Sequence, residues 1–207
     1  IYNGSSWYDF SEHNAMRTAF RSKWNIPPTA TVIGTIGRLH PVKGQIYLAE
    51  AMKILSSDHP GLHVLIIGEG PLHDQLGEFF TTNNMPHTIT GYYPNAWEAI
   101  PAMDIFVLPS LSEGMGIVLL EAAQAKVPII ASNTGGIPEV FTDEHEALLC
   151  PPADPSALVH ACRRILSNAD LVESQTISAW QRAKQFTTDH MVKETTDFYV
   201  EVMNEVK

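Results

Sequence analysis

Short runs of apolar residues alternate along the chain with longer segments of helical pattern, and this alternation is what most limits the possible folds. The runs Val64–Ile67 and Ile105–Leu108 are apolar at every position, which is typical of strands covered by helices on both faces. Strands that alternate with helices at this spacing form βαβ units and a parallel sheet. The sequence therefore predicts an α/β fold: a Rossmann-like parallel sheet with helices on both faces, followed by a helical C-terminal tail.

The same patterns set the expected elements. We expect strands at Thr31–Gly37, Leu62–Gly68, His87–Gly91, Asp104–Leu108, Pro128–Ala131 and Ala147–Cys150. We expect helices at Glu12–Trp24, Gln45–Ser57, Leu72–Thr82, Ala96–Met103, Gly116–Ala125, Gly136–Phe141, Pro155–Ser167, Leu171–Phe186 and from Asp189 to about Val206. The proline-rich run Cys150–Pro155 separates the last strand from purely helical sequence.

Composition narrows the classes of function. The formal net charge is −10 and no basic patch is visible, which argues against a nucleic-acid binder. No apolar run is long enough to span a bilayer. Two cysteines are too few for a disulfide scaffold or a zinc cluster and favour a reducing compartment. The scattered histidines are interpreted as surface residues, because Pro60 and Gly61 keep His59 and His63 off a common helical face.

Glycine-containing loops follow most of the expected strands. In a parallel sheet these loops share the carboxyl edge, where open α/β sheets bind ligands. Glycine lets the backbone approach a ligand closely. The sequence therefore predicts a ligand site at this edge, built from loops that open at the positions Gly37, Gly68, Gly91, Pro109 and Ser132.

Two basic residues lie in the first of these loops. Arg38 offers a planar fork of donors and Lys43 a mobile point charge, and together they are suited to a diphosphate. The alternative is a pair of solvated surface charges.

Two glutamates lie in and after the loop that begins at Pro109. Glu121 lies within the apolar run Ile117–Ala123 and is expected to be buried, where a carboxylate needs donors such as the hydroxyls of a ribose. The alternatives are a structural glutamate bonded to neighbouring backbone and one that faces solvent. Gly114–Gly116 precede the helix, whose free N–H groups favour an anion such as phosphate.

Taken together, these motifs resemble the C-terminal domain of the family-4 (group 1) glycosyltransferases of the GT-B fold. The order and spacing agree over nearly the whole chain, and the Glu113 and Glu121 pair is the family's signature. The matching stretches are Asn3-Gly4, Gly37–Leu39 with Lys43-Gly44, Gly68–Pro71, Pro109-Ser110, Glu113–Gly116, Glu121-Ala122 and Gly135–Glu139.

The resemblance implies an organisation. Residues 1–28 would hold the interdomain start and the first helix, and residues 29–168 a Rossmann-like domain that binds a nucleotide sugar. Residues 169–207 would form a helical tail that in relatives reaches back to an N-terminal, acceptor-binding domain. The chain begins at the Asn-Gly that normally follows the interdomain crossing, so we expect the donor half alone and no sugar transfer by it.

The resemblance also implies roles for individual residues. Arg38 and Lys43 would hold the diphosphate, and Glu121 would bind the ribose. Glu113, as the catalytic residue, would contact the donor sugar or stabilise the charge of the site. Backbone N–H groups from Gly114 through Gly116 to Ile117 would meet phosphate or sugar. The full protein would transfer a hexosyl group, with retention, from a UDP- or GDP-linked sugar to a glycan or lipid, without a metal ion or other cofactor. A cytoplasmic location follows, with contact to a membrane only through the other domain.

Some features depart from the family pattern, and other functions stay open. Lys126 stands where the family usually has Gly, which puts the turn geometry in question, and Met115 replaces a common Phe. The alternatives are a non-catalytic sugar-nucleotide-binding module and a GT-B-fold epimerase. A nicotinamide-dependent dehydrogenase fits poorly, because His73 occupies the third Gly position of its fingerprint.

The C-terminal helix has its own pattern. An apolar stripe repeats at helical spacing. It must fold onto its own domain, pair with another copy or stay partly exposed. The stripe comprises Met191, Val192, Thr195, Phe198, Tyr199, Val202 and Met203.

Overall fold

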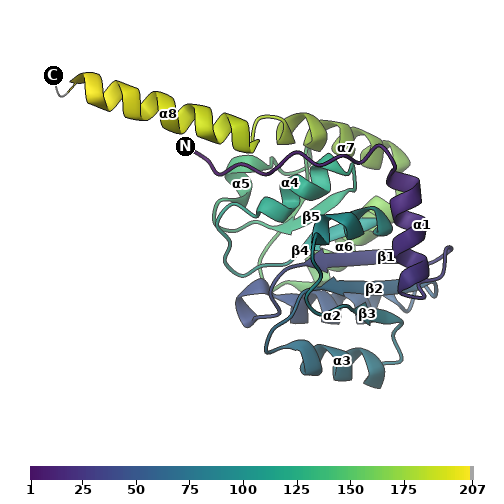
Figure 1. Ribbon diagram of the computed structural model, residues 1–207. Helices are drawn as coiled ribbons and strands as arrows, with labels where there is room; N and C mark the ends of the chain where they lie inside the picture. Colours follow the sequence, from purple (N-terminus) through teal and green to yellow (C-terminus); the bar gives the residue numbers. More distant parts are fainter. Residues whose placement is uncertain (206–207) are drawn as a thin grey trace.

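A parallel sheet forms the centre of the molecule in the computed structural model, which describes residues 1–205 (Figure 1). Its six strands run in the order β3-β2-β1-β4-β5-β6. The predicted parallel sheet is confirmed, and the predicted strand ends differ from the observed ones by one or two residues. The strands are β1 (Thr31–Ile36), β2 (Leu62–Ile67), β3 (His87–Ile89), β4 (Ile105–Leu108), β5 (Ile129–Ser132) and β6 (Leu148–Cys150).

The helices follow the predicted segments closely. Two differences have local causes: a short 3₁₀ turn, η1, precedes α2, and the helix expected at 96–103 is a 3₁₀ helix, η2, which contains Pro101. Val206, the expected end of the last helix, lies outside the described residues. The elements are α1 (His13–Lys23), η1 (Pro41–Lys43), α2 (Gln45–Leu55), α3 (His73–Thr82), η2 (Ala96–Ala102), α4 (Ile117–Gln124), α5 (Ile137–Val140), α6 (Pro155–Ser167), α7 (Ala169–Ala183) and α8 (Thr188–Glu205).

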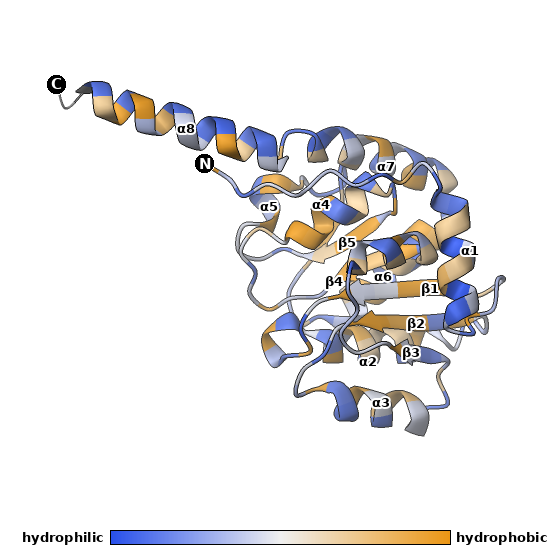
Figure 2. Cartoon of the chain, in the orientation of Figure 1, coloured by the Kyte–Doolittle hydropathy of each residue, from blue (hydrophilic) through white to orange (hydrophobic). Residues whose placement is uncertain are grey.

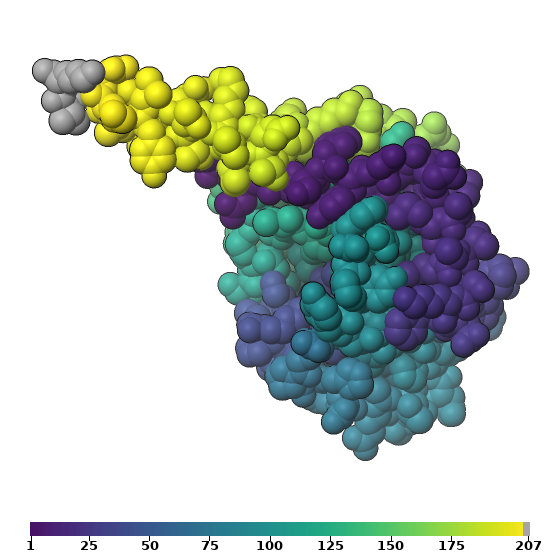
Figure 3. Space-filling model, in the orientation of Figure 1, coloured from purple at the N-terminus to yellow at the C-terminus, as the bar shows by residue number. Residues whose placement is uncertain are grey.

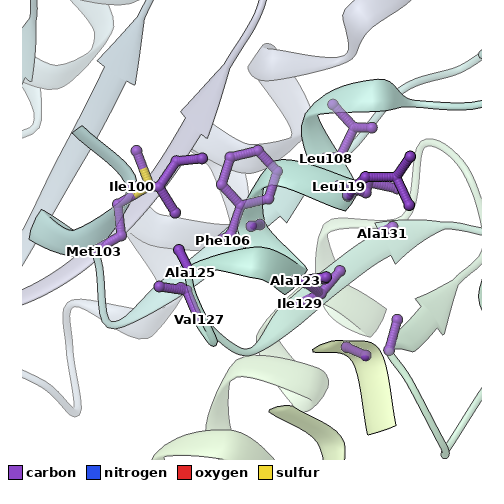
Figure 4. Close-up of a cluster of buried hydrophobic side chains, with 14 of the residues drawn as sticks. Ile100, Met103, Phe106, Leu108, Leu119, Ala123, Ala125, Val127, Ile129 and Ala131 are labelled. Carbon is purple, nitrogen blue, oxygen red and sulfur yellow. The ribbon is translucent and has the colours of Figure 1, made fainter. Parts of the chain in front are cut away.

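Helices cover both faces of the sheet, as the unbroken apolar strands predict. One apolar cluster joins α2, α3 and α6 to the sheet, and a second joins α1, η2, α4, α5 and α7 to the opposite face. The strands β4 and β5 are coloured as largely hydrophobic in Figure 2. Figure 4 shows part of the second cluster, in which Phe106 of β4 lies between Ile100 of η2 and Leu119 of α4. The division at residues 28 and 168 stays a prediction.

A buried arginine ties α1 to the amino edge of the sheet. The Arg21 side chain is 3% exposed, and its guanidinium donates to the backbone carbonyls of Ala102, Pro28 and Ala30 and to Asp104. The other carboxylate oxygen of Asp104 accepts from Arg17 at 2.6 Å. A buried charge that lost these partners would be costly, so this network fixes how α1 enters the fold.

The last helix, α8, leaves the body of the molecule. It projects as a rod in Figures 1 and 3, while its first turn stays close to Tyr2 and the chain start. Phe198, Tyr199 and Met203 are 53%, 63% and 66% exposed. Of the outcomes considered for the apolar stripe, the one present here is exposure to solvent.

Other polar and thiol groups are interior. His63 is 6% exposed and its Nε2 lies 2.9 Å from Thr88 Oγ1, so the interpretation of the histidines as surface residues is wrong there. Burial also lowers the pKa of His63 to about 4. Cys150 and Cys162 are both buried, free thiols. Within residues 1–205, no His, Cys, Asp and Glu side chains cluster as metal ligands would, and no helix is long and apolar enough to cross a membrane.

Candidate functional site

The candidate site lies where the strand order reverses. β1 pairs with β2 on one side and with β4 on the other, so the chain winds outward from this point in both directions. The loop after β1 (37–44) and the loop after β4 (109–116) meet here at the carboxyl edge. The Leu111 N–H donates to the Val42 carbonyl at 2.8 Å. In open α/β sheets this topological switch point is where ligands bind.

Lys43 and Glu113 meet across this junction. Lys43 Nζ lies 2.6 Å from Glu113 Oε2, and the two side chains are 25% and 13% exposed. The same carboxylate accepts from the Ser110 hydroxyl at 3.1 Å and from the Gly114 N–H at 3.2 Å. The structure thus brings together two predicted site residues from segments 70 positions apart, with Glu113 held by several donors.

Arg38 has a different setting from Lys43. Its side chain is exposed, and no acceptor in residues 1–205 lies within hydrogen-bond distance of its guanidinium. Its backbone is fixed instead, because the buried Gln45 donates from Nε2 to the Arg38 carbonyl at 3.0 Å. Arg38 is therefore an available cation on an ordered loop at the same edge.

The start of α4 presents free donors to this edge. Gly116 adopts a left-handed conformation with φ 71° as the helix N-cap. The N–H groups of Gly116, Ile117 and Val118 find no acceptor among the described residues, as is usual for the first turn of a helix. Such donors, together with the helix dipole, favour an anion. Although it begins the apolar run, Ile117 is 41% exposed, so this turn of α4 is not buried.

Glu121 lies one turn further along α4. Its side chain is half-buried, and within residues 1–205 no donor or cation meets its carboxylate. Burial raises the pKa of the Glu121 carboxyl to about 7. The alternative of a structural glutamate bonded to neighbouring backbone therefore finds no support, and the carboxylate is free to accept from a ligand.

The glycines of these loops fall into two groups, according to what a Cβ at each position would contact. A Cβ on Gly44, Gly68 or Gly135 would lie 2.0, 2.0 or 1.8 Å from a carbonyl oxygen of a neighbouring loop. Gly37, Gly91 and Gly114, in contrast, have open space where a Cβ would lie, with nothing within 4 Å of it. The glycines of the first group let the loops pack on one another, and close approach of these loops to a ligand stays a prediction.

Sequence reasoning missed the residues that support the site. Ser110 is completely buried and bonds to Glu113, and the Thr134 hydroxyl donates to the Leu111 carbonyl at 3.1 Å. Gln45 holds the loop of Arg38. The Pro109-Ser110 pair is part of the matching pattern, but no spacing rule distinguishes a supporting serine or glutamine from a surface one.

The departures from the family pattern leave the local geometry intact. Lys126 adopts the left-handed conformation, with φ 55°, that a glycine normally provides after a helix. The bonds Lys126 N–H to Ala123 and Val127 N–H to Ala122 close the turn. Met115 is half-buried against the apolar cluster beneath α4. Of the two tyrosines after β3, Tyr92 is 72% exposed, whereas Tyr93 packs edge-on against Phe20.

With this geometry in place, comparison with known proteins assigns the family. The model of glycosyl transferases group 1 matches residues 16–182. The chain belongs to this family. The group 1 assignment agrees with the resemblance based on the motifs.

Individual relatives place the chain within longer group 1 proteins. It is 32% identical over 157 residues to the putative teichuronic acid biosynthesis glycosyltransferase TuaC of Bacillus subtilis, covering 75% of this chain and 38% of that one. The fold matches Anabaena HepE, solved in complex with UDP-glucose, with a TM-score of 0.87 at 19% identity, over 97% of this chain and 57% of that one. The chain thus spans about half the length of such relatives, or less.

One solved structure matches along nearly its whole length. It is the C-terminal domain of the group 1 family protein LpcC from Francisella tularensis, with a TM-score of 0.76 at 20% identity, over 89% of this chain and 97% of that one. The likeness supports the Rossmann-like half of a GT-B fold that the motifs predict.

Proposed function

We propose that this chain binds a nucleoside diphosphate sugar across the switch point and forms the donor half of a retaining glycosyltransferase. The observation that carries the proposal is the junction of Lys43, Glu113 and the free N–H groups of α4 on two interlocked loops. HepE, which has the same fold, was solved with UDP-glucose. The donor would be UDP- or GDP-linked, and the full protein would pass its hexosyl group to a glycan or lipid.

Positive groups at the edge are suited to a diphosphate. Lys43 and Arg38 supply two cations, and the first turn of α4, with Gly114 and Gly116 before it, supplies neutral donors. Charge-assisted bonds of this kind are roughly twice as strong as neutral ones. They would neutralise the leaving diphosphate without a metal ion, so metal-independent binding is part of the proposal.

The two glutamates would bind the parts of the donor on either side of the diphosphate, the ribose and the sugar. Glu121, half-buried and without a partner among the described residues, is suited to accept from the vicinal hydroxyls of a ribose. Glu113 lies beside Lys43, and there it would contact the hexosyl group or balance developing charge as the catalytic residue. The Lys43–Glu113 bond would loosen as the diphosphate takes over the ammonium.

Calorimetric titration of the chain with UDP, UDP-glucose, GDP and GDP-mannose tests the proposal. We expect binding in the presence of EDTA, with an affinity that falls as salt screens the charge pairs. Lys43→Ala is expected to weaken binding by about 1.5–3 kcal/mol, roughly tenfold to a hundredfold. Lys53→Ala is the matched control, because Lys53 is an exposed lysine on the outer side of α2.

Two outcomes would count against the proposal. Equal loss of affinity in the Lys43 and Lys53 variants would mean that net charge, not the junction, attracts the nucleotide. Binding that needs added magnesium would rule out the metal-independent part.

A further inference from the structure

A hollow lies at the opposite, amino edge of the sheet from the switch point. It has a volume of about 620 Å³ and is lined by the N-terminal segment, the end of α4 and Trp180 of α7. Cavities of roughly 300–1,000 Å³ are the usual size for small-molecule sites. The hollow shares no lining residue with the switch-point site, and nothing in the proposed donor site accounts for it.

Trp7 lines this hollow; hydrogen bonds fix the backbone around it, whereas its side chain is partly exposed. On either side of Trp7, the Tyr8 N–H donates to Gln124 Oε1 at 2.9 Å, and Gln124 Nε2 donates to the Ser6 carbonyl at 3.0 Å. The Trp7 side chain is nevertheless 46% exposed. Because the backbone is already ordered, a ligand that stacks on this indole loses little free energy in fixing it.

The second indole forms a wall of the hollow. Trp180 meets Trp7 edge-on, with ring centroids 6.3 Å apart. The Lys184 ammonium lies 3.4 Å from the Trp180 centroid and occupies one of its faces. Trp7, in contrast, is half-exposed, and no cation lies over its ring among the described residues. It is therefore the indole of the pair that is more accessible to a ligand.

Polar groups of both kinds surround Trp7. The Lys126 ammonium lies 4.9 Å from the Trp180 centroid and forms no ion pair within the described chain. Asp9 accepts from the Ser11 N–H at 2.8 Å, and Ser11 and His13 complete the rim. A mixture of donors and acceptors suits hydroxyl groups, which need both, whereas a carboxylate such as Asp9 disfavours a phosphate or other anion.

We propose that this hollow is a carbohydrate-binding site for an uncharged pyranose unit of a glycan, stacked on Trp7 and hydrogen-bonded by Asp9 and Lys126. A half-exposed indole beside mixed polar groups matches a sugar ring, which has an apolar C–H face and a rim of hydroxyls. The site is independent of the donor site, and either can be present without the other. It would hold a glycan on the far side of the domain from the switch point.

The test is titration of the chain with maltotetraose, cellotetraose and chitotetraose, with tetragalacturonate as an acidic comparison, followed by calorimetry and by saturation transfer from the indole protons to the sugar. We expect at least one neutral tetrasaccharide to bind, undisturbed by saturating UDP. Trp7→Ala should weaken it roughly tenfold, in line with the contribution of an aromatic contact. Ile54→Ala is the matched control, because Ile54 is also 46% exposed but lies on α2.

Asp9→Asn serves as a second variant that keeps a carbonyl oxygen for the Ser11 N–H, and it should also weaken binding, with an unchanged melting temperature. The proposal is overturned if no neutral tetrasaccharide binds, if Trp7→Ala binds as the parent does, if tetragalacturonate binds more tightly than every neutral sugar, or if UDP displaces the saccharide. Failure of nucleotide binding alone would reject the donor site and leave this one standing.

Discussion

The carboxyl group of Glu121 has no partner among the described residues, and this has a consequence for stability. Burial raises its pKa from 4.5 to about 7, so the folded state holds the proton more tightly than the unfolded state does. Below about pH 4.5 the carboxyl is protonated in both states and does not affect the free energy of unfolding. As pH rises from about 4.5 to 7, the unfolded state loses the proton first, so the free energy of unfolding falls. The parent should lose about 2–4 °C of melting temperature relative to Glu121→Gln over that range.

The measurement is thermal unfolding of both proteins across this pH range. Glu50→Gln is the control, because Glu50 is an exposed glutamate on α2. If the melting temperatures of the parent and Glu121→Gln changed in parallel with pH, the Glu121 carboxyl would have an ordinary pKa, and the prediction would be wrong.

Lys126 has a conformational strain that a glycine would avoid. A side chain in the left-handed region is disfavoured by about 1 kcal/mol, and Lys126 has φ 55°. Lys126→Gly should therefore raise the free energy of unfolding by about 0.5–1 kcal/mol, measured by urea unfolding. A loss of stability would mean that the cation–π contact with Trp180 outweighs the strain.

The same substitution bears on the amino-edge hollow. If the Lys126 ammonium binds the saccharide, Lys126→Gly should raise the free energy of unfolding and also weaken saccharide binding. Lys126→Gln keeps the strain and removes the charge, so it separates the two effects.

At the scale of the elements, glycines set how the loops pack. The Gly135 position has φ 55° and a Cβ there would lie 1.8 Å from the Glu113 carbonyl oxygen, whereas Gly114 has open space around it. Gly135→Ala should lower the free energy of unfolding by about 2–3 kcal/mol. Gly114→Ala should change it by no more than about 0.5 kcal/mol.

Urea unfolding of the two variants gives these values, and nucleotide titration supplies the complementary result. Gly114→Ala places a methyl group where the donor phosphate or sugar is expected, so it should bind nucleotide more weakly while remaining stable. Equal stability losses in both variants would contradict the distinction between packing and ligand-facing glycines.

How far the sequence predicts the elements depends on how local their causes are. Strands such as β2 and β4 are apolar at most or all positions, and helices such as α6 carry clear start signals, with Asp154 capping the Ala157 N–H, so both are predicted well. The 3₁₀ form of η2 goes with Pro101, which has no N–H to donate within an α-helix, and hydrophobic periodicity does not register this.

The candidate site divides in the same way. The motifs predict Arg38, Lys43, Glu113 and Glu121, and their loops do gather at one edge. The direct Lys43–Glu113 contact, the support from Ser110 and the Arg21 network could not be predicted, because their geometry depends on how the folded chain brings separate segments together. The burial of His63 was missed because its polar type outweighed its place in an apolar strand.

At the scale of the whole molecule, the proposed donor edge would need a second surface to bring an acceptor to it. Transfer requires an acceptor within about 3–3.5 Å of the anomeric carbon, and the chain spans only part of its relatives' length. We expect residues 1–207 to bind donor without transferring sugar. The exposed stripe on α8 agrees with a chain that meets further protein there.

A product assay with radiolabelled donor compares this chain with a version that carries a preceding acceptor domain. Turnover is expected only in the longer protein. Comparable turnover by both would place the catalytic machinery within these residues, and the absence of product from either, despite donor binding, would favour a non-catalytic module. An epimerised nucleotide sugar as product would favour the epimerase.

The interlocked loops at the carboxyl edge have one more consequence. Contacts such as Gly44 against Pro109 and Gly135 against Glu113, with hydrogen bonds such as Leu111 to Val42, join backbone to backbone. Loops joined in this way cannot open one at a time, so their amides should exchange with solvent at similar rates, as one cooperative unit. A nucleotide arriving at such an edge meets a preset surface, whose ordering is already complete when the protein has folded.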